Sequence, residues 1–477
     1  MKSLIRILAV SLIVLVVSSC KKQLDEKPLD FAAPENFFKT EAEAKSAVYS
    51  LYNTVVNANA YNVSLYMLND LPSVELDGIS GPFKIVDEFT YGNSFFWLDY
   101  YQGAYTAFQR ANLILERVPS ITMDNTLKNA YLGEARYMRA LHYFNLIRLF
   151  GDVPLVTNYQ LDLGVATNNP RVNKENIYTT IIDDLKFAEN SLPATYPLTE
   201  VGRATKGAAK TLLSLVYLTH KDYSLARDKS KEVMDLGVYS LAANYRDVFD
   251  PAKKNNAEHI FSVQYKMFRV GSWFESILSP PGTTGCGFAD NIAGVNQTFF
   301  NNYPNSYRKD ISMLTSYKNT AGDTIKYSRP FVKKYIAWGP ENVCFSGENN
   351  FPVFRYAEVL LIFAEAENEV SGPSTAAYNA INAVRKRART DAAGVETAAA
   401  LPNLSGLSKD DFRKAVWRER EMELCFEGHA FFDLTRTDRL ISENATIGKT
   451  VNPKYKLYPI PQYALDANKG LSQNPGY

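Results

Sequence analysis

Cys425 and His429 are the first residues whose types and spacing could perform chemistry. They lie four positions apart, so on a helix they would share one face and could form a thiol–imidazole pair. Leu424 and Phe426 flank the cysteine, however, and apolar neighbours of this kind are typical of a buried structural thiol. The sequence therefore favours a structural role for Cys425.

The other side chains that commonly perform catalysis show no recognisable spacing. The four histidines, at 142, 220, 259 and 429, form no H-E-x-x-H motif, and the chain has no G-x-S-x-G elbow. Residues 202–208 space two glycines like a phosphate loop, but Ala208 replaces the required lysine. Glycoside hydrolysis needs two carboxylates about 5 to 10 Å apart, and the sequence singles out no pair among its 51 acidic residues. We therefore predict a non-enzyme without cofactor or catalytic metal, leaving open a structural calcium ion.

Cys20 could accept a lipid through its thiol. Lys2 and Arg6 are followed by an apolar run over 7–17 and then by small residues up to the cysteine. The run is too short to cross a bilayer, so it predicts a cleaved leader over 1–19. A cysteine at the cleavage point resembles a lipobox, the acceptor of the diacylglyceryl anchor in bacterial lipoproteins. The alternative is an ordinary leader with an incidental cysteine.

The remaining cysteines and the charge balance restrict the class of protein. Cys286, Cys344 and Cys425 are an odd number in an exported chain, which favours buried thiols over a disulfide framework, although one pair would be compatible. Removal of residues 1–19 changes the net charge from +1 to −1, which argues against a nucleic-acid partner. Aromatic residues make up 13% of the chain, and a surplus of Tyr and Trp suits a surface that binds by stacking.

Helical periodicity dominates the chain and must position these side chains. Leu213-Ser214, Tyr217 and Ala226 match the large-small-aromatic-small spacing of a tetratricopeptide repeat. Phe363-Ala364 followed by Ala376, Ala380 and Ala383 repeats the idea. The pattern predicts a mainly α fold of tetratricopeptide-like helix hairpins with few short strands. Helices are expected over 41–57, 101–118, 127–150, 174–192, 204–220, 223–236, 355–370, 374–390 and 409–425.

Two stretches lack sustained periodicity. They cover about 59–100 and 250–350 and are rich in Gly, Asn, Asp, Pro and aromatic residues, which predicts loop-rich insertions. A short strand over 260–263 is compatible with the second. Polar residues 20–34 read as a tether, and 35–477 is expected to form a single domain.

Five segments carry a recognisable pattern. They are Cys20 with Lys21-Lys22 and Leu24-Asp25; E-A-R-Y-M-R-A-L-H-Y-F-N-L-I-R-L-F-G-D-V-P-L over 134–155; F-R-Y-A-E-V-L-L-I-F-A-E-A-E-N-E over 354–369; R-E-R-E over 418–421 with F-E-G-H-A-F-F-D-L over 426–434; and Y-P-I-P over 458–461 with Q-N-P-G-Y over 473–477. In this order and spacing they resemble the SusD/RagB family of outer-membrane nutrient-binding lipoproteins. The resemblance spans almost the whole chain.

The resemblance implies a helical scaffold with the ligand site in its loop-rich part. It also implies a lipid anchor, exposure at the cell surface, and a role as a hinged lid over a SusC-like TonB-dependent transporter. The implied ligand is an oligosaccharide or, as in some members, a peptide.

Charged residues stand among apolar ones in the shared segments, and Pro459 and Pro461 preset an extended tail that should dock along the helices. We interpret the charged residues as buried or partly buried pairs that hold helices together. They are Arg355 with Glu358, and Glu427 and Asp433 near Arg436.

Sugars present flat apolar faces ringed by hydroxyls, which aromatic and polar side chains match. Residues of these types in the two loop regions are the predicted ligand contacts, and we expect them to be exposed. Whether Trp97 packs inward or faces ligand stays open. The predicted contacts are Asn69, Asp70, Asp77, Phe83, Tyr91, Trp97, Trp273 and Phe274.

Three functions are compatible with the sequence. The favoured one is a surface glycan-binding lipoprotein that works with a transporter, with peptide binding by the same architecture as a variant. The second is a lipoprotein glycoside hydrolase. The third is a helical scaffold that binds only protein.

Overall fold

The structure, a computed structural model, describes residues 37–160, 164, 167–280, 283, 292–319, 321–336 and 345–477. Cys20, the expected leader and the expected tether lie outside these residues, as do Cys286 and Cys344. Within the described residues, no helix combines the length and the apolarity that a membrane crossing requires.

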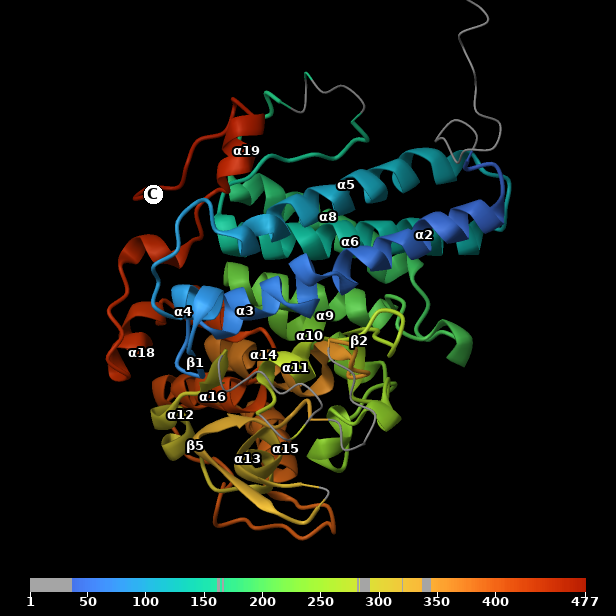
Figure 1. Ribbon diagram of the computed structural model, residues 1–477. Helices are drawn as coiled ribbons and strands as arrows, with labels where there is room; N and C mark the ends of the chain where they lie inside the picture. The colour runs from blue at the N-terminus through green and yellow to red at the C-terminus, as the bar shows by residue number, and fades with distance from the viewer. Residues whose placement is uncertain are drawn as a thin grey trace, which may run out of the picture.

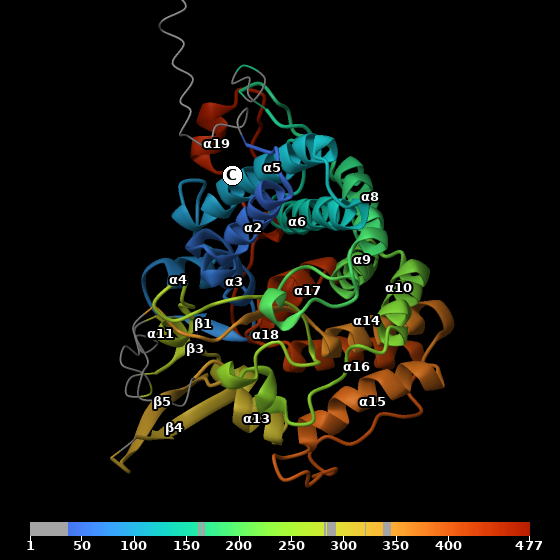
Figure 2. The ribbon, with the colours of Figure 1, turned by 90° about the vertical axis from the view of Figure 1, so that its right-hand side faces the viewer.

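Long helices form the scaffold, and each packs against the next along the chain. Contacts run from α5 to α6, α8, α9, α10, α14 and α15 in turn, which Figure 2 shows as an arc, while α2 lies against α5 and α6 (Figure 1). The mainly α prediction is confirmed, and every predicted helix is present. The helices are α2 (Glu41–Val56), α5 (Tyr100–Arg117), α6 (Asn125–Phe150), α8 (Lys174–Ser191), α9 (Lys206–His220), α10 (Tyr223–Asp235), α14 (Tyr356–Ser371), α15 (Thr375–Arg389) and α16 (Lys409–Glu423).

Small residues bring the helices of a hairpin together. Ser214 of α9 and Ala226 of α10 are both fully buried, as the repeat pattern predicts. In the later pair, Ala380 is buried but Ala376 and Ala383 are exposed. The prediction that Ala376 and Ala383 pack between the two helices is therefore wrong. The orientation of α15 turns Ala377 toward α14 in their place.

The stretch over 59–100 is more regular than its composition predicts. Apolar residues of α3 bury that helix completely, so its polar residues are buried with it. The elements of this stretch are the π-helical η2 (Ala58–Asn62), α3 (Ser64–Asp70), β1 (Leu76–Gly78), α4 (Gly81–Asp87) and the 3₁₀ helix η3 (Phe96–Asp99).

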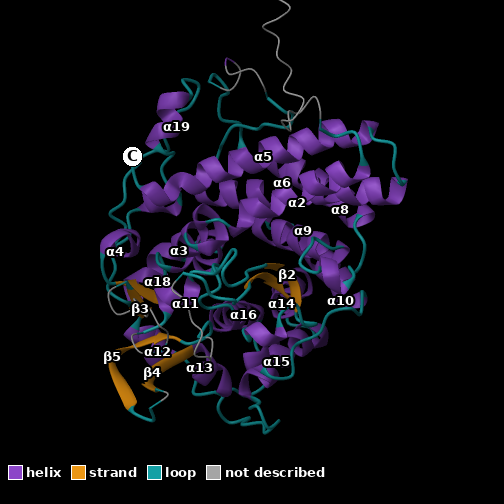
Figure 3. Ribbon diagram, turned by 45° about the vertical axis from the view of Figure 1, so that its right-hand side comes forward, coloured by secondary structure: helices purple, strands orange, loops and turns teal. Residues whose placement is uncertain are grey.

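Short strands pair in twos among the described residues, and β2, β3, β4 and β5 come from the stretch over 250–350. All three pairs are antiparallel: β1 with β3, β2 with β6, and β4 with β5. Figure 3 shows β4 and β5 set apart from α5, α6 and α8, whereas the Phe261 ring of β2 lies 5.1 Å from that of Tyr137 on α6. The strand expected over 260–263 is confirmed by β2. The elements here are β2 (His259–Val263), α11 (Phe274–Leu278), β3 (Ala293–Val295), α12 (Gln297–Asn302), α13 (Tyr307–Ser312), β4 (Met313–Lys318), β5 (Thr324–Val332) and β6 (Phe351–Arg355).

Short helices complete the chain. They join the long helices or lie along the final segment. They are α17 (Ala430–Arg436), α18 (Leu440–Thr446), α19 (Gln462–Ala467) and the 3₁₀ helices η4 (Val118–Ser120), η5 (Leu198–Glu200), η6 (Tyr245–Val248), η7 (Pro251–Lys253) and η9 (Pro453–Lys456).

A network of buried charges joins the loop-rich part to the scaffold, and we call it the buried ion network. Glu423 lies at its centre: Arg308 Nη1 and Arg355 Nη1 each lie 2.6 Å from a Glu423 oxygen, and Arg387 contacts the same carboxylate. The remaining members come from the segment between β5 and β6, from α15, from α16 and the turn after it, and from the residue before β2. They are Lys334, Arg385, Glu258, Glu419 and Glu427.

The predicted helix-holding ion pairs are confirmed, with one exchange of partners. Arg355 pairs with Glu427 at 2.7 Å, and Arg436 pairs with Asp433 at 2.7 Å. Glu358 pairs with Arg420 at 3.1 Å and not with Arg355. Arg355 ends β6 and Glu358 lies in the first turn of α14, so the two side chains leave the backbone in different directions.

The final segment docks along the helices, as its prolines predict. Tyr458 N donates to Leu149 O at 2.7 Å, at the end of α6. The Asn474 amide donates to Phe150 O at 2.9 Å and to Tyr458 O at 2.7 Å. The Asn474 side chain therefore joins the end of the tail both to α6 and to an earlier part of the tail.

Candidate functional site

Three aromatic side chains form an exposed surface, which we call the aromatic platform. They are Phe268, Trp273 and Phe345, with exposed fractions of 75%, 36% and 39%. The Trp273 and Phe345 ring centroids lie 5.2 Å apart. Phe268 N donates to Ser346 Oγ at 2.9 Å, which places Phe268 beside the residue that follows Phe345. Exposed rings of this kind offer flat apolar faces to a ligand.

The backbone beneath the platform is fixed by hydrogen bonds. Ser272 and Gly347 exchange two N–H···O bonds of 2.9 Å, which join the two segments that carry the rings. Gly271 approaches so closely that a Cβ there would lie 2.2 Å from Ser346 Cα, so only glycine fits. Such a support holds the rings in place before a ligand arrives.

Asn62 clamps the platform to the scaffold. Its amide donates to Gly271 O at 3.1 Å, and its Oδ1 accepts from Trp273 N at 2.8 Å. Asn62 ends η2, whose Ala60 has non-helical backbone angles, and distortions of this π type recur at functional sites. Because Asn62 lies in the first predicted loop region and Gly271 and Trp273 lie in the second, the two regions meet at this clamp.

The two predicted contacts in the second region point in opposite directions. Trp273 is exposed on the platform, as expected. Phe274 is completely buried, with its ring 5.6 Å from that of Tyr66 and 5.2 Å from that of Phe351. The expectation of an exposed Phe274 is therefore wrong, because it begins α11 facing the core.

In the first region the expected exposure is wrong for Asn69, Asp70 and Tyr91, all of which are buried. Asn69 Nδ2 donates to Leu65 O within α3, and Asp70 accepts from Gly428 N at 3.0 and 3.1 Å. Tyr91 stacks on Tyr458 with centroids 4.8 Å apart.

Trp97 packs inward, which settles the alternative left open by the sequence. Its ring lies 4.8 Å from that of Phe83, which is half-buried. Asp77 is partly exposed and accepts from Asn296 Nδ2 at 2.8 Å. The exposed aromatic residue of this region is Phe96, at 56%.

The sequence reading missed Phe96, Phe268 and Phe345. Phe96 stands in the run F-F-W, and its ring lies 5.4 Å from that of Phe95 and 5.8 Å from that of Trp97, so the run itself gave no signal that Phe96 is the exposed member. Phe268 lies at the tip of a turn closed by a bridge between Lys266 and Val270, a location that favours exposure. No sequence signal identifies Phe345, because its exposure depends on the contact between Ser272 and Gly347.

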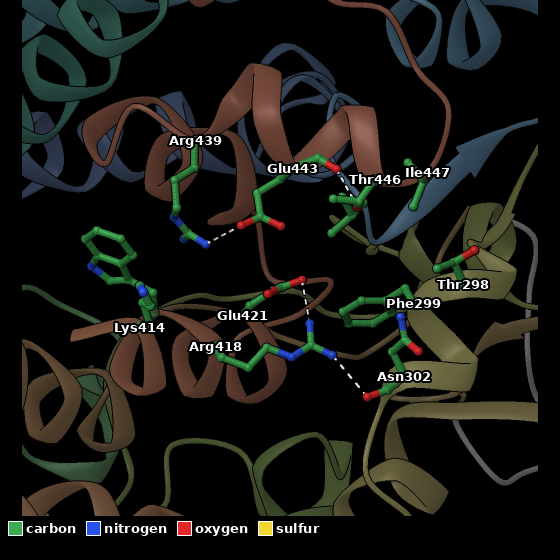
Figure 4. A pocket seen from close by; sticks show the side chains of 12 residues that line it. Thr298, Phe299, Asn302, Lys414, Arg418, Glu421, Arg439, Glu443, Thr446 and Ile447 are labelled. Atoms are coloured by element: carbon green, nitrogen blue, oxygen red, sulfur yellow. Dashed lines mark hydrogen bonds and ion pairs between the residues drawn. The ribbon is translucent and has the colours of Figure 1, made fainter. Parts of the chain in front are cut away.

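A concave surface separate from the platform lies between α12, α16 and α18, and we call it the α16–α18 groove (Figure 4). Its cavity volume is about 790 Å³. Phe299, Lys414, Trp417, Arg418, Arg439 and Glu443 are among the residues that line it. None of the predicted ligand contacts lies there. The spacing of 414, 417, 418 and 421 on one helical face was the available signal.

Cys425 and His429, the candidate catalytic pair, make separate contacts. Burial raises the pKa of the Cys425 thiol to about 12, and its Sγ donates to Met422 O. His429 Nδ1 instead lies 3.7 Å from Glu358 Oε1, so no thiol–imidazole pair forms. No group of three or more His, Cys, Asp or Glu side chains in the described ranges could hold a metal ion.

Known proteins resemble this chain over most of its length. The family model described as "SusD family" matches residues 282–477, and the one described as "Starch-binding associating with outer membrane" matches residues 24–218. SusD-like protein P2 of Formosa agariphila is 28% identical, over 95% of this chain and 96% of its own. Starch-binding protein SusD of Bacteroides thetaiotaomicron is 24% identical, over 77% of this chain and 76% of its own.

Solved structures agree with these matches. The crystal structure of a SusD superfamily protein from Parabacteroides distasonis superposes with a TM-score of 0.82 at 25% identity, covering 92% of this chain and 99% of that one. The helical arc and the short paired strands agree with the two family models, which match residues 24–218 and 282–477. The chain therefore belongs to the SusD family.

Proposed function

We propose that this chain is a cell-surface lipoprotein of the outer membrane that binds oligosaccharides and passes them to a SusC-like TonB-dependent transporter. The observation that carries the proposal is the aromatic platform, with Trp273 and Phe345 exposed side by side on a support fixed by Asn62. Stacking on such rings suits the apolar faces of sugars. The relative from Bacteroides thetaiotaomicron is named for starch binding, which supports a role in binding and not in hydrolysis.

Replacing Trp273 with alanine is expected to weaken oligosaccharide binding by about five- to tenfold, since one aromatic contact contributes about 1 kcal/mol beyond its buried area. Isothermal titration calorimetry with malto-, laminari- and xylo-oligosaccharides measures the change. Tyr463→Ala is the matched control, because Tyr463 is an equally exposed aromatic residue on α19 that does not belong to the platform.

Unchanged affinity in both Trp273→Ala and Phe345→Ala would remove the platform from the proposal. A glycan array without a hit, combined with retained binding to the transporter, would favour a peptide ligand or a scaffold that binds only protein. Release of shortened sugars by the purified protein would favour the glycoside hydrolase.

Replacing Cys20 with alanine is expected to release or mislocalise the protein and to leave its ligand affinity unchanged, because the thiol would be the only covalent link to lipid. Fractionation of cells into membrane and soluble material measures the first effect, and calorimetry measures the second. Ser18→Ala keeps the thiol and should fractionate like the wild type. Normal nutrient uptake supported by soluble Cys20→Ala protein would contradict the role of the anchor.

A further inference from the structure

The α16–α18 groove is a ligand-sized space that the aromatic platform does not explain. Its volume of about 790 Å³ falls within the roughly 300–1,000 Å³ typical of small-molecule sites. Protein interiors are otherwise packed nearly without voids. The groove shares no lining residue with the platform, so a ligand there would occupy a separate site.

Two helical faces line the groove from opposite sides (Figure 4). On α16 the lining residues recur at the spacing of one face: Lys414, Trp417, Arg418 and Glu421. The other side is formed by the N-terminal cap of α18 and its exposed face: Arg439, Glu443 and Thr446. Both faces carry polar and aromatic side chains, whereas helix faces that pack against each other are usually apolar.

The walls of the groove are held in place without a ligand. The Trp417 indole N–H donates to Glu365 Oε1 at 3.0 Å, and Arg436 Nη1 donates to the same oxygen at 2.6 Å. The Arg439 guanidinium lies 4.7 Å from the Trp417 ring centre. Arg418 Nη2 donates to Asn302 O at 3.2 Å, which joins α16 to α12. A ligand would therefore meet an ordered surface.

The charges of the groove leave a positive excess. Arg418 lies 2.9 Å from Glu421, and Arg439 lies 3.0 Å from Glu443, so each carboxylate is neutralised by its own arginine. Lys414 is exposed and makes no ion pair with any residue in the described part of the chain. Its ammonium group is thus left to attract an anion from solution.

We propose that the α16–α18 groove is a second binding site, for oligosaccharides that carry carboxylate or sulfate groups. Trp417 supplies an indole surface, the paired arginines and carboxylates supply donors and acceptors for hydroxyl groups, and Lys414 holds the acidic substituent. Ligand binding in the groove does not require the aromatic platform, so an experiment can disprove either site without disproving the other.

The test compares oligogalacturonate, which carries carboxylates, with a sulfated carrageenan oligosaccharide and with neutral maltoheptaose, each added to the purified full-length chain. Hydrogen exchange is expected to show protection of the α16 and α18 amides by at least one acidic probe and none there by maltoheptaose. Lys414→Glu is expected to weaken acidic-probe binding by about tenfold or more, the loss of one charge-assisted hydrogen bond.

Lys186→Glu is the matched control, because Lys186 is also an exposed helical lysine without an ion pair among the described residues, and it lies on α8. Protection by only one acidic probe identifies the anionic group. Binding of neither acidic probe, protection at other helices, or equal affinity in Lys414→Glu would overturn the proposal. Trp273→Ala, which tests the platform, should leave binding of the acidic probe unchanged.

Discussion

Glu423→Ala should lower the free energy of unfolding by about 3–5 kcal/mol, the cost of leaving buried charges without their partner. Arg308, Arg355 and Arg387 all contact this carboxylate, and all three are buried. Burial alone would raise the pKa of Glu423, but the three guanidinium groups outweigh it and hold that pKa well below its usual range. Removing the carboxylate leaves three buried guanidinium groups without this negative partner.

Denaturation with guanidinium chloride at neutral pH measures this loss. Glu232→Ala is the matched control, because Glu232 also pairs with two lysines but is 44% exposed, and a surface pair contributes about 1 kcal/mol or less. Glu423→Gln keeps the shape of the side chain and provides a milder variant if alanine prevents folding. Equal small losses in Glu423→Ala and Glu232→Ala would show that the network does not stabilise the fold.

The second large effect is a dependence of stability on pH that Asp70 produces. Burial raises the pKa of Asp70 to about 7, although the Gly428 and Ala430 N–H groups donate to it and lower that value. Because the folded pKa exceeds the ordinary value of 3.8, the folded chain binds the proton more tightly, and stability rises as pH falls from above 7 toward 4. Between pH 8 and pH 5 this single group contributes on the order of 2 kcal/mol.

Denaturation curves at pH 8, 6.5 and 5 for the wild type and for Asp70→Asn isolate this contribution. Asp87, whose pKa is raised by burial to about 6, acts in the same direction, so the difference between the two proteins is the relevant quantity. Below pH 4.5 the sign reverses, since the depressed pKa of Glu423 stabilises the fold only while Glu423 is ionised. Asp438→Asn, at an exposed position, should keep the wild-type slope between pH 8 and 5. An identical slope in Asp70→Asn would refute the role of Asp70.

The scaffold was predictable because residues at the ends of its helices signal where each helix begins and ends. Asp124 caps α6 by accepting from Leu127 N, and Gly151 ends it with a positive φ of 72°. Such signals are local, so they can be read from one segment at a time. Glu358 of α14 and Asp433 and Arg436 of α17 were correctly interpreted as members of internal pairs, but the partner of Glu358 depends on tertiary contacts.

The site was less predictable because exposure is a property of the whole fold. Asn69 and Asp70 look like loop residues, yet α3 is buried on every side. Trp273 and Phe274 are neighbours, yet one is exposed and the other fully buried. Composition selects the right kind of residue, but only packing decides which side of the backbone faces solvent.

The docking of the final segment against the first part of the chain has a consequence for biosynthesis. Tyr458 Oη donates to Leu68 O across 390 positions, and Phe426 N donates to Glu75 across 351. Contacts this distant in sequence close late and slow folding. A nascent chain would expose α3 and its surroundings until almost all of the sequence had left the ribosome. Chaperones and the export machinery would thus bind the chain before these long-range contacts had formed.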